Sequence, residues 1–305
     1  MTLGKTALSI AAALLVFCGP AATAQAAVTC TQLYEETKGV SKNVDALKAL
    51  FAKAAARHDC DEEFKRALGR KVSVAITADV EAALKRGSTL EEHEIDLIDS
   101  LHYFRHWQVL ATLGDLADGR RDRENATKRY QEALDAIEDK SLTANAPPPA
   151  TIKTIVAKAE TARLLSANYV AVPRTRGNPT GLGAPSIRGV VIKKVAVPIT
   201  FEFGSAEFTE KGAAAAQDLL SYLKAQGAPS ITLAGHTDPV GSEESNHVLS
   251  IKRAERVREF LAAAEYASEI KIIGHGETQP FEPTNPEKYS EDELHQMSRR
   301  VELLR

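Results

Sequence analysis

Most of the functional information in this chain lies in one stretch, Gly235-His236-Thr237-Asp238-Pro239-Val240-Gly241-Ser242, which is followed by Asn246 and by Leu249-Ser250-Ile251-Lys252-Arg253-Ala254. The residues before the motif predict a strand, and those from Ser245 onward predict a helix that turns by about 100° per residue. The stretch therefore places an acid, Asp238, where a strand ends, and a base, Arg253, on the helix that follows.

Arg253 falls on the apolar side of that predicted helix. Asn246 and Arg253 both lie near the middle of one stripe, whose other members are Leu249, Val257, Phe260, Leu261 and Ala264. An arginine is almost never fully buried without a partner, because an unpaired charge is costly away from water. Two interpretations follow: Asp238 forms a structural ion pair with Arg253, or the two charges flank a ligand that carries both signs.

The surrounding region alternates strands and helices. We expect strands over 190–203, 230–236, 269–273 and 299–304, and helices over 209–226, 245–264 and near Ser290. Such alternation predicts a sheet covered by helices.

Several short motifs follow one another in this region in a fixed order. They are Ile199-Thr200-Phe201, Gly-His-Thr-Asp at 235–238, Gly241-Ser242, Asn246, Leu249-Ser250, Arg253-Ala254 and Arg299-Arg300-Val301. In this combination, residues 190–305 resemble the OmpA-like peptidoglycan-binding domain, which outer-membrane proteins, lipoproteins and flagellar-stator proteins share. The resemblance implies a βαβαβ-type two-layer α/β sandwich with a mixed sheet.

The resemblance also implies a binding site for the free end of diaminopimelate in the peptide stem of the cell wall. Carried over, Asp238 would accept the ammonium group of the ligand and Arg253 would hold its carboxylate, while Asn246 and Thr237 would supply hydrogen bonds. The chemistry agrees, because a free amino-acid end is a zwitterion and a planar guanidinium forks onto a carboxylate.

Two positions depart from the family pattern. Gly204 stands where a polar side chain is common, so its contact with the ligand would come from the backbone. Ser298 precedes Arg299 and Arg300 where the family usually has Asn. We expect Arg299 to contact the ligand, and the alternative is that one of the two arginines pairs with the acidic segment Glu291-Asp292-Glu293.

The N-terminus predicts export. Lys5, the apolar stretch over 7–17 and Ala24-Gln25-Ala26 have the pattern of a signal peptide over 1–26. The alternative is a lipid anchor on Cys18. Cleavage leaves Cys30 and Cys60, and two cysteines in an exported chain predict one disulfide, with two free thiols as the alternative. We expect the protein in the periplasm, associated with the cell wall, with the outer membrane as a further location.

Residues 27–170 predict a separate, all-α domain, which makes the chain an α+β protein of two domains. The spacing of Leu113-Gly114, Ala126, Tyr130 and Ala133 matches a tetratricopeptide repeat. A longer helix is expected over 91–110. The glycines and prolines over 171–189 predict a linker before the domain at 190–305.

The composition excludes some function classes. With 305 residues, 26% charged residues and a net charge of −3, the chain shows no general attraction for nucleic acid. The region before the linker lacks the alternation of a transmembrane barrel. We find no catalytic motif and expect no cofactor, so the sequence favours a non-enzyme that anchors to peptidoglycan and uses its helical domain toward a protein partner.

Two other functions stay open from the sequence. One is a helical interaction scaffold in the periplasm with a merely structural C-terminal domain. The other is a zinc-dependent wall hydrolase whose ligands come from His236, His247, His275, Asp238 and Glu277.

Overall fold

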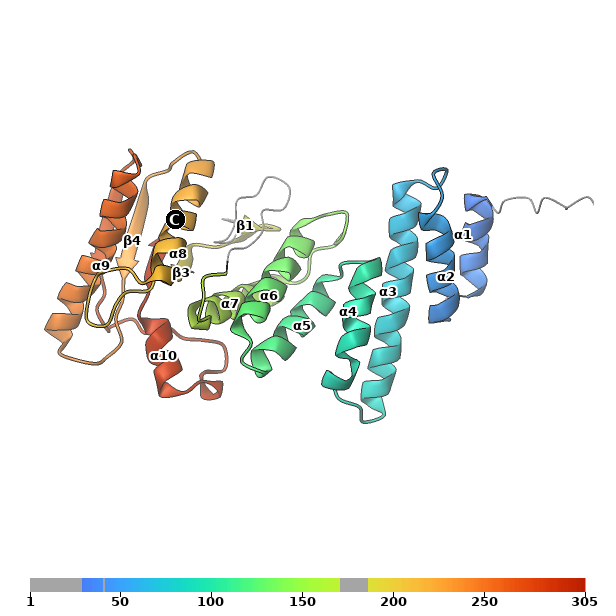
Figure 1. Cartoon of the computed structure of the whole chain (residues 1–305), viewed down its shortest axis with the longest axis horizontal. Coiled ribbons are helices and arrows are strands. Elements are labelled where there is room, and N and C mark those ends of the chain that lie inside the picture. Colours follow the sequence, from blue (N-terminus) through green and yellow to red (C-terminus); the bar gives the residue numbers. More distant parts are fainter. Residues whose placement is uncertain (1–28, 41, 171–185, 305) are drawn as a thin grey trace, which may run out of the picture.

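The computed structural model describes residues 29–40, 42–170 and 186–304, so the predicted signal peptide over 1–26 lies outside the described residues. A row of helices leads into an α/β domain at the other end of the molecule (Figure 1). No helix in the described ranges has both the length and the apolar composition needed to cross a membrane. The row consists of α1 (Cys30–Gly39), α2 (Val44–Ala55), α3 (Glu62–Lys85), the 3-10 helix η1 (Glu91–His93), α4 (Glu94–Tyr103), α5 (Trp107–Gly119), α6 (Arg123–Glu138) and α7 (Pro149–Leu165).

The single helix expected over 91–110 is interrupted in the structure. Phe104 is extended, with φ −157° and ψ 126°, and the side chain of His106 then caps the start of α5. The cause is tertiary packing, because Phe104 is buried and the guanidinium of Arg70 lies 4.6 Å from the centre of its ring. The hydrophobic pattern along the sequence does not reveal this contact.

Helices α5 and α6 form a closely packed pair. A Cβ atom on Gly114 would lie 2.6 Å from a ring carbon of Tyr130, so only glycine permits this approach. Tyr130 and Ala133 belong to a core that also includes residues of α7. The small and large positions predicted for this pair are therefore in contact, and the assignment to tetratricopeptide repeats stays a prediction.

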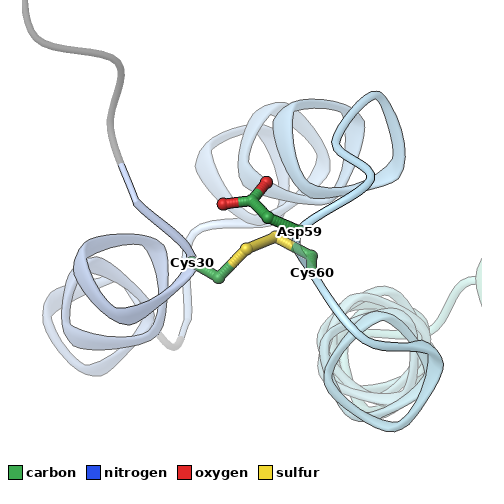
Figure 2. A group of neighbouring side chains, drawn as sticks. All are labelled: Cys30, Asp59 and Cys60. Atoms are coloured by element: carbon green, nitrogen blue, oxygen red, sulfur yellow. A yellow bond between two sulfur atoms is a disulfide. The ribbon is translucent and has the colours of Figure 1, made fainter.

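A disulfide joins Cys30 at the start of α1 to Cys60 just before α3, as predicted (Figure 2). The two Cα atoms are 5.5 Å apart, and 30 positions separate the residues in the sequence. Asp59 lies beside the bridge and accepts hydrogen bonds from the side chain of Arg57. Cys60 belongs to the buried cluster formed by α1, α2 and α3, which includes Leu33, Leu47 and Leu68, so the bridge ties α1 to the other two helices.

Replacing both cysteines by serine is expected to destabilise the end of the row that contains α1 to α3. Closing a loop of this length restricts the unfolded chain, so the loss should be about 3.6 kcal/mol. Urea unfolding of the double variant, followed by circular dichroism, measures it. Dithiothreitol should lower the stability of the wild type and leave that of the variant unchanged; an equal response of both proteins would contradict the prediction.

The α/β domain contains a four-stranded mixed sheet, as predicted. The strand order is β3-β6-β4-β5, in which β4 and β5 are parallel and the other pairs are antiparallel. Helices α8 and α9 cover one face over a core that includes Val195, Leu219, Leu233, Val257 and Leu303. The elements are β3 (Lys194–Val197), α8 (Glu210–Ala225), β4 (Ile231–Gly235), α9 (Glu243–Ala263), β5 (Ile270–Gly274), the 3-10 helix η2 (Pro286–Lys288), α10 (Glu291–Ser298) and β6 (Val301–Leu304).

The entry to this domain differs from the expectation. Of the linker predicted over 171–189, the part up to 185 lies outside the described residues. Ser186–Ile187 (β1) pairs with Val190–Val191 (β2) in a hairpin. Ile187 and Val190 are buried in the core of α6 and α7, so this hairpin packs on the helical row. The strand expected over 190–203 is thereby divided into β2, β3 and a single bridge at Phe201.

Helix α7 covers part of the second face of the sheet, together with α10 (Figure 1). Leu164 and Leu165 of α7 pack with Ala196 of β3 and Met297 of α10. The ammonium group of Lys211 on α8 donates hydrogen bonds to carbonyl groups at the C-terminus of α7, including those of Leu164 and Ser166. The helical row therefore continues into the α/β domain through a shared hydrophobic layer.

This junction contains a titratable acid, Glu160 of α7, which accepts a hydrogen bond from the backbone N–H of Ala196 at 3.3 Å. Burial raises the pKa of Glu160 to about 7, against the opposing effects of Arg163, that N–H group and Lys194, while Glu302 adds to the rise. A raised carboxyl pKa means that the folded protein prefers the protonated form. Protonated Glu160 therefore contributes to the stability of the fold. This contribution is complete below pH 4.5, the pKa of the group in the unfolded chain, and it is lost as the pH rises to about 7.

Replacing Glu160 with glutamine should therefore stabilise the protein in a pH-dependent way. We expect the E160Q variant to unfold at a higher temperature than the wild type at pH 8 and at nearly the same temperature at pH 5. Because both proteins share every other titrating group, the difference between their melting curves isolates Glu160. A difference that is equal at the two pH values would contradict the assignment.

Candidate functional site

The candidate site lies where β4 ends and α9 begins. Ser242 caps α9 and forms a capping box with Ser245, so the helix begins at Glu243, two residues before the predicted start. Between strand and helix, the chain forms a loop over 236–242 that contains Thr237 and Asp238, both buried. Asp238, the predicted acid, therefore lies just after the end of β4 and is buried.

The carboxylate of Asp238 is held from two sides. Its Oδ1 accepts a hydrogen bond from the backbone N–H of Val240 at 3.2 Å. Its Oδ2 accepts one from Nη1 of Arg299 at 2.5 Å. The partner of Asp238 is thus Arg299, and no ion pair joins Asp238 to Arg253 in the part of the chain that the structure describes. The interpretation as a structural Asp238–Arg253 pair is wrong.

Arg253 is only 2% exposed and extends from α9 toward Phe201 and Ser205. Its Nε donates to the backbone carbonyl of Ser205 at 3.1 Å, and its guanidinium carbon lies 5.1 Å from the centre of the Phe201 ring. Its Nη1 is buried without a hydrogen-bond partner among the described residues. Burial lowers the pKa of Arg253 to about 10, with Asp238 opposing and Arg299 adding to the shift, so the group is still a cation at neutral pH.

Asn246 organises the loop and does not cap the helix. Its Nδ2 donates to the carbonyl groups of Asp238 at 3.2 Å and Val240 at 3.3 Å. The same nitrogen also lies within hydrogen-bond distance of Oε2 of Glu277. Asn246 therefore fixes the backbone on both sides of Pro239, and it links this loop to the one that follows β5.

A tight turn over 202–205 contacts Arg253. The N–H of Ser205 donates to the carbonyl of Glu202 at 3.1 Å, and Gly204 has φ 65°, which favours glycine at this turn position. The turn presents the carbonyl of Ser205 to Arg253 and leaves Phe203 92% exposed. Sequence reasoning missed Ser205, because a backbone acceptor has no side-chain signature.

The two neighbouring arginines bind different acids: Arg299 donates to Asp238, whereas Arg300 donates to Glu302. Arg300 is buried and donates from Nε and Nη2 to Oε1 of Glu302, at 2.9 Å and 2.7 Å. Burial alone would raise the pKa of Glu302, but His236 and Arg300 outweigh it and hold this pKa low. Neither arginine pairs with the acidic segment over 291–293, so that alternative is wrong. Glu293 accepts instead from Arg123 of the helical row.

Two histidines of the zinc alternative, His236 and His275, lie side by side with ring centres 5.1 Å apart, but among the described residues no third donor atom completes a metal-ligand group with them. His236 is fully buried, and its Nδ1 lies 3.2 Å from the carbonyl of Gln279. Within the described ranges, the only group of three potential metal ligands with donor atoms close together is Cys30, Asp59 and Cys60. Two of these form the disulfide.

The geometry suits a ligand that carries both charges. The site offers an anion, Asp238, and a separate cation, Arg253. It also contains two buried polar atoms without partners among the described residues, Nη1 of Arg253 and Oγ1 of Thr237. A buried polar group that lacks a partner costs free energy, so such atoms mark a place where a ligand can supply the hydrogen bond.

Comparison with known proteins gives matches to the C-terminal region. Residues 200–292 match the model of the OmpA family. The chain is 34% identical over 113 residues to outer membrane porin F of Pseudomonas aeruginosa, in a match that covers 35% of this chain and 31% of the porin. It is 35% identical over 85 residues to the peptidoglycan-associated lipoprotein of Legionella pneumophila, which covers 27% of this chain and 45% of the lipoprotein.

A solved structure gives a match of similar extent. The peptidoglycan-associated lipoprotein from Burkholderia pseudomallei aligns over 38% of this chain and 91% of its own, with 25% identity and a TM-score of 0.29. By contrast, the matches to the porin and to the Legionella lipoprotein cover 31% and 45% of those proteins, which is less than half of either length. The resemblance seen in the sequence is confirmed for the OmpA-family domain at 200–292.

Proposed function

We propose that this protein binds peptidoglycan without catalysis and so anchors an exported protein to the cell wall. The contact would be the free amino-acid end of diaminopimelate in the stem peptide. Asp238 would accept hydrogen bonds from the ligand's ammonium group, and the unpartnered Nη1 of Arg253 would donate to its carboxylate. Thr237 would add a hydroxyl, and the turn at Gly204 would contribute backbone groups beside Arg253.

One observation carries this proposal: Arg253 is buried with an unused donor, although an acid lies nearby and is bound elsewhere. An ion pair between Asp238 and Arg253 would have used this donor, whereas here Asp238 pairs with the partly exposed Arg299 and the donor of Arg253 is left free among the described residues. The OmpA-family match over 200–292 and the likeness to peptidoglycan-associated lipoproteins support the same reading. With them, we propose a location in the periplasm at the cell wall, and the outer membrane as a further location.

Affinity for one stem peptide should be modest. Each charge-assisted hydrogen bond contributes about 1.5–3 kcal/mol before the costs of ordering and desolvation. Retention on the wall would then rest on the many equivalent sites that a polymer offers for rebinding.

Sedimentation of the full chain with purified sacculi tests the proposal. We expect the protein to pellet with the sacculi and to be released by free meso-diaminopimelate in excess. Pelleting that free meso-diaminopimelate does not reverse would contradict the proposed contact. The full chain is the suitable material because α7 packs on the sheet, and a fragment over 190–305 would expose that layer.

A helical scaffold is the second candidate. Ile95, which is 80% exposed, and Ile98 lie one turn apart on α4, and such apolar exposure favours a protein partner for the helical row. The two candidates differ at Asp238: as a pure scaffold, the protein would bind sacculi equally well with and without this carboxylate.

A further inference from the structure

Helix α10 connects the helical row to the candidate site. Near its N-terminus, the carboxylate of Glu293 accepts a hydrogen bond from Nη2 of Arg123 at 2.9 Å and lies 3.1 Å from Nη1 of Arg121. Arg123 is itself buried, pairs with Asp118, and lies over the ring of Tyr289 at 5.4 Å. This end of α10 is therefore clamped by residues that belong to α5, α6 and the turn between them.

The other end of α10 reaches the site. Arg299 is the C-cap residue, its N–H donates to the carbonyl of His295, and its Nη1 donates to Asp238. Between the ends, Met297 packs on Leu164 and Leu165. The side-chain amide of Gln296 donates to the carbonyl of Leu164 at 3.1 Å. A helix of eight residues is about 12 Å long and moves as a unit, so a displacement at Glu293 also displaces Arg299.

The bond from Arg299 matters because of what Asp238 would otherwise do. Asp238 is the acidic group whose charge acts on Arg253, and Arg253 has a buried donor without a partner among the described residues. An unpaired buried cation is costly, so an unrestrained Asp238 would turn toward Arg253. The two charges would then neutralise each other, and neither would be available to a zwitterion.

We propose that Arg299 is a positioning residue that holds Asp238 away from Arg253, an inference that rests on the proposed function. Arg121 and Arg123 of the helical row keep Arg299 in place through Glu293 and α10. The helical row is then coupled to the binding site at Asp238. Anything that displaces the clamp at Glu293 weakens wall binding, and by linkage wall binding strengthens the clamp.

The test is a double-variant cycle on the full chain, with a stem tripeptide that carries meso-diaminopimelate as the probe and calorimetry as the readout. E293Q keeps the capping box at Ser290 and removes the ion pairs. We expect R299Q to weaken binding about tenfold and E293Q about threefold. The E293Q/R299Q double variant should bind no more weakly than R299Q, because both changes act through Arg299.

Two further variants separate positioning from general damage. R299K keeps a cation that can reach Asp238 and should restore most of the affinity that R299Q loses. E94Q removes the pair between Glu94 and Arg120, which lies in the same helical row without involving α10, and should leave the affinity unchanged. All variants should keep the circular dichroism of the wild type.

The outcomes are distinct. Independent, multiplying effects of E293Q and R299Q would overturn the coupling, as would an R299Q variant that binds as tightly as the wild type or more tightly. These results leave the proposed function standing if D238A has lost binding. If D238A binds the tripeptide like the wild type, the proposed function itself fails.

Discussion

Replacing Asp238 with alanine is expected to abolish retention on sacculi and to leave the fold intact. The ammonium group of the ligand would lose the acidic acceptor that Asp238 provides, and Arg253 and Arg299 would then repel it. The fold should survive, because Asp238 belongs to a loop and is absent from the hydrophobic cores. Arg299, which is partly exposed, can be solvated without it.

Asp238→Asn makes this prediction sharper. The amide oxygen can still accept the hydrogen bond from the N–H of Val240, so the loop should keep its shape while the charge is lost. We expect about a hundredfold drop in affinity, since the charge-assisted contact with the ligand's ammonium group disappears. Asp99→Asn, in an ion pair with Lys48 on the helical row, is the control and should bind normally. Wild-type retention by a folded Asp238→Ala protein would rule out this site.

Replacing Arg253 with methionine should affect binding and stability in opposite directions. The ligand carboxylate would lose its guanidinium partner, so we expect wall binding to fall about a hundredfold. The protein should at the same time become more stable, because burial of an incompletely paired cation lowers the pKa of Arg253 and costs free energy. Methionine fills similar space without a charge, and the midpoint of thermal unfolding should rise by a few degrees.

A thermal melt and a sacculus pelleting assay on the same Arg253→Met preparation measure both effects. Gains in stability on removing a functional group are expected where the group is kept at a cost to the fold. A strongly destabilised variant would show that Arg253 is a structural residue. A stable variant with undiminished binding would show that the carboxylate contact is made elsewhere.

The local features of the site could be predicted from the sequence because they depend on neighbours along the chain. Thr209 caps α8 and Ser242 caps α9, each close to the predicted helix start. The phase of α9 correctly buried both Asn246 and Arg253. The end of β4 correctly placed Asp238 in the following loop.

The long-range features could not be predicted in the same way. Arg299 and Asp238 are separated by 61 positions, and Arg123 and Glu293 by 170. Many other charges in the sequence could have formed these pairs, so only the packing of α7 and α10 on the sheet selects them. The break at Phe104 and the hairpin at Ser186–Val191 arise for the same reason, since both depend on burial against distant helices.

The most direct measurement compares three forms of one stem tripeptide with the full-length wild-type protein. In the first, the free end of meso-diaminopimelate is unmodified; in the second, its amine is acetylated; in the third, its carboxylate is an amide. If Asp238 and Arg253 are kept apart to hold a zwitterion, the unmodified peptide should bind at least tenfold more tightly than either blocked form. Equal binding of the acetylated or the amidated peptide would contradict this role of the two charges.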